Sequence, residues 1–443
     1  MKKLLVIAYF FPPSGAVGVY RTLKFVKYLP EFGWEPVVLT VSNGKFPVYD
    51  ESLMKLIPAG LEVHRCPSWE VLNEGFDRAG GATQPKKTLG SRLHTRLYMA
   101  WHGLAVPDVK LGWVPSATRA ARHLVREQGI RHVYISGYPF SSFLVGPRLK
   151  HGNDVRVAVD YRDPWTQSVT YPLRTALHRR IDRALEQRVV DASDLVIANT
   201  RFNEQQMVAG FGRGVRRERF VTIHNGFDAP DFASIEHGRN PQFTITYAGA
   251  FYHSVGSSHA NRAAGDDVMK TYSPLCFFEA LQSFLARRPQ AKATTRVRFM
   301  GVLGQGYDPI IRERGLDGVI ERLGYIGYDD HLRVLKQSDA LLLVMSRGEK
   351  SRGWIPSKFF QYLGTGNPVL ALAPEGEVRD ILAATKGGIC VEPDDAVAAS
   401  RAIETLYDAW KNGTAIARPD ASAVAVYERR NLTAKLARAL DSM

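Results

Sequence analysis

Short apolar runs alternate with helical patterns along most of this chain, and this alternation limits the possible folds more than any other feature. The first run, LLVIAYFF at 4–11, leads through a glycine-containing turn to a helical pattern near 17–30, and then to PVVLTV at 36–41. Continuous apolar runs of this length are typical of parallel strands buried on both faces. The sequence therefore predicts an α/β fold built from βαβ units.

The alternation stops once and then restarts. Candidate strands lie at 132–137, 156–162, 195–200, 220–226, 243–251, 295–301, 340–346, 368–374 and 388–393. The polar stretch 228–242 indicates a linker, and 443 residues are too many for one ordinary core. We therefore expect two Rossmann-like domains with parallel sheets, 1–227 and 243–415, that face each other across a cleft. Ligands of such folds bind beyond the carboxyl ends of the strands.

The chain is basic, with a formal net charge of +14, which favours an anionic partner. No nucleic-acid-binding module or aromatic-studded basic sheet is visible, so we do not expect nucleic acid. The cysteines Cys66, Cys276 and Cys390 include no Cys-x-x-Cys pair and favour a reducing cytoplasm over a disulfide framework or a zinc site. The start, MKKLLVIAYFFPP, lacks the cleavage site of a signal peptide, and no apolar run approaches the roughly 18 residues of a membrane span.

Basic residues gather in one part of the first domain. Residues 86–104 place leucines and a tryptophan at near-helical spacing, flanked by lysines and arginines. A basic amphipathic helix of this kind can lie in a membrane interface, so we expect this segment to bind an anionic membrane surface. A helix packed on its own domain stays an alternative.

A glycine-containing turn follows the first strand. Gly15 and Gly18 lie in PPSGAVGVYR, directly before the predicted helix. Glycines let backbone N–H groups approach a phosphate, and a helix N-terminus adds partial positive charge. The spacing differs from Gly-x-Gly-x-x-Gly, so a tight turn without a ligand is the alternative.

A second phosphate site is predicted in SRGWIPSKFFQYLGTGNPVLAL, residues 351–372. Pro356 suits the first turn of a helix, because its missing N–H would be unpaired there. Ser357 and Lys358 then present free N–H groups, a hydroxyl and an ammonium at the positive helix end, and Gln361 follows one turn later, where a ribose would lie. The alternative is a capped surface loop that binds nothing.

The best polar cluster of the first domain is VDYRDPW. Asp160, Arg162 and Asp163 follow a predicted buried strand and are expected at its carboxyl end. An aspartate there could orient an acceptor hydroxyl or take its proton, and the arginine could neutralise a phosphate. The alternative is an Asp–Arg pair that braces the loop, with Trp165 packed beneath it.

The chain resembles the glycosyltransferases of family 4, which have the two-domain GT-B fold, and within them the bacterial branch that builds cell-surface polysaccharides. The segments that carry the resemblance are YFFPPSGAVGVYRTLKFVKYL, PDVKLGWVPSA, ISGYPFSS, VDYRDPW, IHNGFD, ITYAGAF, PSKFFQYLGTGNPVLAL and RRNLTAKLARALD. The resemblance implies a nucleotide-sugar donor on the C-terminal domain and an acceptor on the N-terminal one. It also implies retention of configuration without a metal or other cofactor, and a last helix at 425–443 that returns to the first domain.

The chain departs from the family pattern in two places. Members usually carry a pair of glutamates around the predicted donor helix, where this chain has Gly353 and Gln361. Gln361 can still accept a hydrogen bond from a ribose hydroxyl, and Glu349 upstream could replace the first carboxylate. Many members also have a histidine in the segment where this chain has Ser142 and Phe143.

These patterns and the resemblance together predict a retaining, metal-independent glycosyltransferase. It would move a sugar from a nucleotide-diphosphate sugar to a lipid-linked or saccharide acceptor in surface polysaccharide assembly, as a peripheral enzyme at the inner face of the cell membrane. Gly15, Gly18, Ser357 and Lys358 would stabilise the charge of the leaving diphosphate. The alternatives are a nucleotide-sugar epimerase of the same fold and a catalytically inactive, nucleotide-sugar-binding partner subunit.

Overall fold

The computed structural model describes residues 1–16, 18–46, 48–69, 104–168, 175–212, 214–238, 240–251, 272–414 and 419–443. The predicted membrane helix at 86–104 therefore lies, except for Leu104, outside the described residues. The chain divides into two compact units. Unit 1 comprises Met1–Ser168, Arg174–His224 and Leu432–Met443, and unit 2 contains Asn225–Asn431.

Unit 1 is built on a seven-stranded parallel sheet in the order β3-β2-β1-β4-β5-β6-β7. Its strands are β1 (Lys2–Ala8), β2 (Trp34–Val41), β3 (Glu62–Cys66), β4 (His132–Gly137), β5 (Arg156–Tyr161), β6 (Leu195–Ala198) and β7 (Phe220–Thr222). The central strands are apolar at successive positions because helices cover both faces of the sheet.

The helices of unit 1 are α1 (Val19–Tyr28), α3 (Val114–Gln128), α4 (Val145–Lys150), α5 (Ala176–Ala192) and α6 (Arg201–Phe211). Threonine side chains cap two of them: Thr175 accepts a hydrogen bond from the N–H of His178 in α5, and Thr200 accepts one from Asn203 in α6. Such caps satisfy N–H groups that a helix leaves unpaired in its first turn. Short 3-10 helices, η1 (Leu29–Phe32), η2 (Glu51–Leu56), η3 (Val109–Trp113), η4 (Phe140–Leu144) and η5 (Arg217–Arg219), complete the unit.

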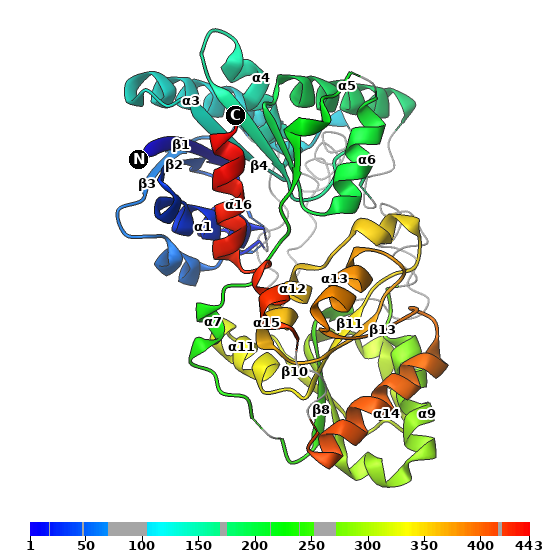
Figure 1. Cartoon of the computed structure of the whole chain (residues 1–443). Coiled ribbons are helices and arrows are strands. Elements are labelled where there is room, and N and C mark those ends of the chain that lie inside the picture. Colours follow the sequence, from blue (N-terminus) through cyan, green and yellow to red (C-terminus); the bar gives the residue numbers. More distant parts are fainter. Residues whose placement is uncertain are drawn as a thin grey trace, which may run out of the picture. The chain divides into compact units, whose positions relative to one another are not determined.

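The C-terminal helix α16 (Arg429–Asp441) contributes to the core of unit 1, far from it in sequence. Leu432, Leu436 and Leu440 recur every fourth residue and are buried with side chains of β1, α1 and β2. Figure 1 shows this helix, in red, beside the blue N-terminal elements of the unit. The apolar stripe of an amphipathic helix is buried in this way.

Unit 2 has a six-stranded parallel sheet in the order β10-β9-β8-β11-β12-β13. Its strands are β8 (Phe243–Phe251), β9 (Thr295–Leu303), β10 (Ile320–Gly324), β11 (Ala340–Val344), β12 (Val369–Leu372) and β13 (Gly388–Val391). Its helices are α7 (Pro230–Ala233), α9 (Leu275–Arg287), α10 (Asp308–Glu313), α11 (Tyr328–Lys336), α12 (Ser357–Thr365), α13 (Glu377–Thr385), α14 (Ala396–Asn412) and α15 (Ala421–Ala425), with the 3-10 segments η6 (Pro289–Thr294), η7 (Gln305–Tyr307) and η8 (Glu349–Gly353).

Two apolar clusters cover this second sheet. Side chains of α9 and α14, which lie side by side in Figure 1, form one of them, and side chains of α11, α12 and α13 form the other. On adjacent strands, Gly249 of β8 pairs with Gly301 of β9. A Cβ at Gly301 would overlap the carbonyl of Gly249, and the positive φ of 110° at Gly301 also favours glycine.

The predicted α/β fold with two parallel sheets is confirmed. Two strands were missed, β3 and β10, because each is an edge strand whose residues are largely half-buried or exposed and so form no apolar run. The stretch 228–242, expected to be a linker, contains the short helix α7. Among the residues that the structure describes, no helix combines the length and the apolar character needed to cross a membrane.

We predict that Leu436→Ala destabilises unit 1 by about 2–5 kcal/mol, because a wholly buried leucine leaves a cavity when it is truncated. Denaturant unfolding followed by circular dichroism measures the change. Arg438→Ala on the exposed face of the same helix is the matched control and should leave the midpoint nearly unchanged. Equal midpoints for Leu436→Ala and wild type would contradict a packed C-terminal helix.

Candidate functional site

A buried ion pair lies at the centre of unit 1. Nε of Arg21, on α1, donates to Oδ2 of Asp160 at 2.7 Å, and Nη2 donates to Oδ1 at 2.9 Å. The hydroxyl of Tyr134, on β4, also donates to Asp160. Asp160 is wholly buried, so both of its oxygens are engaged by protein groups. The geometry matches the alternative reading of VDYRDPW as a braced Asp–Arg pair, with Arg21 rather than Arg162 as the partner.

The rest of the Arg21 guanidinium donates to backbone carbonyls. Nη1 contacts the carbonyl of His224 at 2.7 Å, and Nη2 contacts that of Ile223 at 2.8 Å. Burial alone would lower the pKa of Arg21, but the charge and hydrogen bonds of Asp160 oppose this and raise it. Arg21 therefore stays charged while it ties α1 to β5 and to the chain that follows β7.

Arg162 lies at the glycine-containing turn of the same unit. A Cβ on Gly18 would overlap the Arg162 guanidinium, so a larger residue there would require this side chain to move from its present position. Gly18 is the N-cap residue of α1, and the first turn of α1 contains no acidic residue. Among the described residues no carboxylate lies within ion-pair distance of Arg162, although the charges of Asp163 and Asp160 raise its pKa against the effect of burial. Two positive groups, the guanidinium and a helix N-terminus, thus lie together, and burial lowers the pKa of Arg162.

Gly15 has a different neighbour. Its N–H donates to the carbonyl of Val48 at 2.8 Å, and a Cβ on Gly15 would press on Val48 and Asp50. The packing of Val48 and Asp50 against Gly15 thus explains why this position has no side chain.

Asp163 is exposed, unlike Asp160, and is followed by Trp165, which is buried and stacks on Phe140 with ring centroids 5.3 Å apart.

In unit 2 the predicted donor residues Ser357, Lys358 and Gln361 share α12. Pro356 is the residue before this helix, no side chain caps its first turn, and no acidic residue lies there. The N-terminal N–H groups of α12 are thus without a carboxylate or hydroxyl acceptor in the described part of the chain. Such a terminus favours an anion.

The ammonium of Lys358 is surrounded by neutral groups. Nζ lies 3.8 Å from the centre of the Tyr247 ring and 3.4 Å from the hydroxyl of Tyr272, and it is 3.0 Å from the place where a Cβ of Gly249 would stand. No ion pair joins Lys358 to a carboxylate of the described residues. Burial lowers its pKa to about 7. A lysine that is desolvated without a counter-ion is well suited to bind an anion from solution.

Gln361 and Glu349 are placed differently. The Gln361 side chain hydrogen-bonds His331 of α11; burial lowers the pKa of His331, and this bond opposes the effect. Glu349 begins η8 and is exposed. No contact of Glu349 with the α12 residues is seen, so Ser357, Lys358 and Gln361 form the group that the fold brings together.

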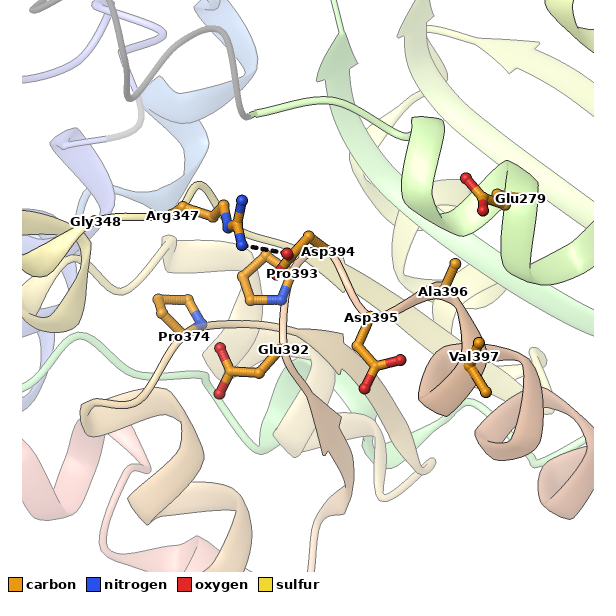
Figure 2. A pocket seen from close by; sticks show the side chains of 10 residues that line it. All are labelled: Glu279, Arg347, Gly348, Pro374, Glu392, Pro393, Asp394, Asp395, Ala396 and Val397. Carbon is orange, nitrogen blue, oxygen red and sulfur yellow. Dashed lines mark hydrogen bonds and ion pairs between the residues drawn. The ribbon is translucent and has the colours of Figure 1, made fainter.

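An open pocket of about 690 Å³ also lies in unit 2, beyond the carboxyl ends of β11, β12 and β13 (Figure 2). Its lining is Glu279, Arg347, Gly348, Pro374, Glu392, Pro393, Asp394, Asp395, Ala396 and Val397. The four carboxylates outnumber the one arginine, which pairs with Asp394 as Figure 2 shows. This lining repels a diphosphate, whereas the start of α12 has no acidic residue in its first turn and favours an anion.

Sequence reasoning missed several residues of these sites. Arg21, Tyr134, His331, Tyr247 and Tyr272 lie within helices, strands or segments whose apolar or mixed pattern gave no functional signal. Ser142 and Phe143, at the position where the family often has a histidine, are both wholly buried, and Phe143 packs on Tyr161 with ring centroids 4.5 Å apart. No group of three histidine, cysteine or acidic side chains suited to a metal occurs among the described residues.

Comparisons with known proteins identify a matching family model and structures of similar fold. Residues 17–226 match the family model described as a glycosyl transferase 4-like domain. Similar solved structures include a glycosyltransferase from Rickettsia africae ESF-5, with 12% identity, a TM-score of 0.61, and coverage of 100% of this chain and 98% of that chain. Another is Anabaena Alr3699/HepE in complex with UDP and glucose, with 14% identity, a TM-score of 0.59 and full coverage of both chains.

A third similar structure is described as a UDP-N-acetylglucosamine 2-epimerase from Listeria monocytogenes, with 11% identity, a TM-score of 0.55, and coverage of 100% of this chain and 96% of that chain. A comparison with curated protein sequences gives no match. At these identities the structural likeness establishes the fold.

We predict that Asp160→Asn destabilises the protein by about 3–5 kcal/mol, because it leaves the buried Arg21 without its counter-charge. The midpoint of guanidinium unfolding measures this. Asp163→Asn, at an exposed position three residues on, is the matched control and should change stability little. If Asp160→Asn were as stable as wild type and had lost only activity, Asp160 would take part in the reaction and would not be needed to hold the fold together.

Proposed function

We propose that this chain, which carries a glycosyl transferase 4-like domain and has the fold of GT-B glycosyltransferases, binds a nucleotide-diphosphate sugar on unit 2 and transfers its sugar. The proposal rests on the surroundings of Lys358. Its ammonium lies among neutral groups at the start of α12, beside N–H groups that no side chain caps. Together these are the parts of a diphosphate site.

The same residues would act on the leaving group. Negative charge grows on the diphosphate as the bond to the sugar breaks, and Lys358, the Ser357 hydroxyl and the N-terminus of α12 would stabilise that charge. Because these groups are already positive or dipolar, we infer a reaction that needs no metal. Retention of configuration follows from the family resemblance, with attack on the same face of the sugar that the diphosphate leaves.

Gln361 is proposed to bind the ribose. It lies one turn after Ser357 on α12, and its hydrogen bond to His331 fixes the orientation of the amide. A glutamine retains the acceptor oxygen of the usual glutamate without its charge. Glu349, exposed in η8, is proposed to approach the sugar.

Unit 1 is proposed to bind the acceptor, a lipid-linked or saccharide molecule. Asp163 is the exposed carboxylate after β5 and would orient or deprotonate the acceptor hydroxyl. The guanidinium of Arg162, which lies against Gly18 at the N-terminus of α1, would neutralise a phosphate group. Asp160 would act indirectly, because its ion pair with Arg21 holds the end of β5 in place. The +14 charge supports a place for this reaction at an anionic membrane surface, through residues 86–104, in surface polysaccharide assembly.

The alternatives predict different products. An epimerase, favoured by the likeness to the Listeria monocytogenes structure, needs no acceptor, and an inactive partner subunit binds donor without changing it. UDP sugars are the first donors to test, because the Anabaena structure is described with UDP and glucose. Incubating the protein with radiolabelled UDP sugars, with and without lipid and saccharide acceptors, separates transfer, epimer formation and binding alone.

We predict that Lys358→Met weakens binding of UDP by about 1.5–3 kcal/mol, the usual contribution of a hydrogen bond to a charged group, or about 10- to 150-fold in Kd. Isothermal titration calorimetry measures the change. Uridine, which has no phosphate, is the matched ligand and should bind both proteins equally. An equal loss for uridine and UDP would remove Lys358 from the phosphate site.

The pH dependence gives a further prediction. Since the pKa of Lys358 is lowered to about 7, its ammonium is charged below that pH and loses its proton above it. UDP affinity should therefore fall above pH 7.5, by at most about tenfold per pH unit, because binding must then take up a proton. The second phosphate ionisation, near pH 6, is already complete there. Lys358→Arg keeps its charge and should show a flat profile over the same range.

A further inference from the structure

Helix α5 of unit 1 buries carboxylates where a helix of this kind normally buries apolar side chains. Its inward face consists of Asp182, Glu186, Val189 and Val190, while its arginines lie outward and are exposed. Asp182 is 0% exposed and Glu186 is 1% exposed. The two are one helical turn apart and so lie on the same face.

Both carboxylates accept hydrogen bonds from the segment that follows β5. Asp182 accepts one from Nε1 of Trp165 at 3.2 Å. A single oxygen of Glu186, Oε2, accepts two from Thr166, one from the backbone N–H at 3.2 Å and one from the hydroxyl at 2.5 Å. Trp165 and Thr166 follow the proposed acceptor residues Arg162 and Asp163 after one intervening residue, Pro164.

Other contacts hold the remainder of this segment. The amide of Asn199 donates to the carbonyl of Arg162, and the side chain of Asn203 donates to Oδ1 of Asn199 at 2.8 Å. The Trp165 ring stacks on Phe140 at an interplanar angle of 3°. The backbone is thus anchored on both sides of Asp163, by Asn199 before it and by α5 after it.

Stability does not explain Glu186. Burial raises its pKa from an ordinary value of 4.5 to about 7, while the bonds from Thr166 and the charge of Arg183 oppose this and the charge of Asp182 adds to it. An acid whose pKa rises on folding makes the folded state less stable as the pH increases from about 4.5 to 7. A buried carboxylate that weakens the fold at neutral pH needs another reason to be there.

We propose that Asp182 and Glu186 are positioning residues that fix the segment 162–168, and through it Arg162 and Asp163, for the transfer reaction. The inference rests on the proposed function. Glu186 orders the backbone through both donors of Thr166, and Asp182 orders the Trp165 ring. Neither carboxylate touches a substrate, since both are buried beneath the segment that they hold.

The test compares Glu186→Met with Glu186→Gln. Methionine has a similar volume but no acceptor for Thr166, whereas the single carbonyl oxygen of glutamine can accept both of its hydrogen bonds. We expect Glu186→Met to lower kcat for sugar transfer at least tenfold at pH 8, with the Kd for UDP unchanged, because UDP is held by unit 2. Glu186→Gln should stay within about twofold of wild type in kcat.

Val189→Ala provides the control for stability. Val189 is wholly buried on the same face of α5 but makes no hydrogen bond to the segment, so its truncation should lower Tm and leave kcat unchanged when assayed well below that Tm. Trp165→Phe tests Asp182, since it removes the Nε1 donor and keeps a ring against Phe140. Tm should fall, because the smaller ring leaves a cavity and Asp182 loses a donor, and kcat should also fall when it is measured well below that Tm. If Glu186→Met keeps kcat within twofold of wild type, the proposed role is wrong.

Hydrogen exchange provides a readout that is independent of activity. Amide exchange in peptides that cover 162–168 should speed up at least tenfold in Glu186→Met and stay at the wild-type rate in Glu186→Gln. If wild type transfers no sugar to any acceptor, the proposed function fails, and exchange still decides whether the carboxylates hold the segment. Unchanged exchange in Glu186→Met would overturn the proposal even in an active enzyme.

Discussion

The ion pair between Arg21 and Asp160 is the interaction on which unit 1 depends most. It joins a helix, α1, to a strand, β5, across 139 positions of sequence, and the same guanidinium also bonds the carbonyls of Ile223 and His224. Both partners are almost fully buried, so neither can lose the other without a large desolvation cost. One arginine therefore fixes helix α1, strand β5 and the chain that follows β7 relative to one another.

The residues of unit 1 that are proposed to act in the reaction lie close in sequence to this ion pair. Asp160 is buried one residue before the end of β5, and Arg162 and Asp163 follow within three positions, so the ion pair determines where the next segment begins. Gly18 leaves the space that the Arg162 guanidinium occupies, and α5 contributes the carboxylates that hold Trp165 and Thr166. Buried polar groups thus hold the backbone on both sides of Asp163, the exposed carboxylate for which a role in the reaction is proposed.

The desolvated cation of unit 2, Lys358, differs from Arg21 in having no carboxylate partner among the described residues. Lys358 is desolvated beside Tyr247 and Tyr272 without a carboxylate among the described residues, and its pKa falls toward neutrality. In unit 1 the protein supplies the counter-charge, whereas in unit 2 an anionic ligand would supply it. Arg21 therefore stabilises the fold, whereas Lys358 is suited to bind an anion.

The sequence by itself determined the α/β class, most strands and the start of α12, because these follow from apolar runs and from local signals such as Pro356 before Ser357 and Lys358. The missed strands β3 and β10 lie at sheet edges, where half-exposed residues give no such run. Only the tertiary structure decided that Asp160 pairs with Arg21, that Gly18 makes room for Arg162, and that Lys358 lies between tyrosines. These contacts join residues far apart in the chain, and local patterns carry no information on which distant side chains meet or which lose their water.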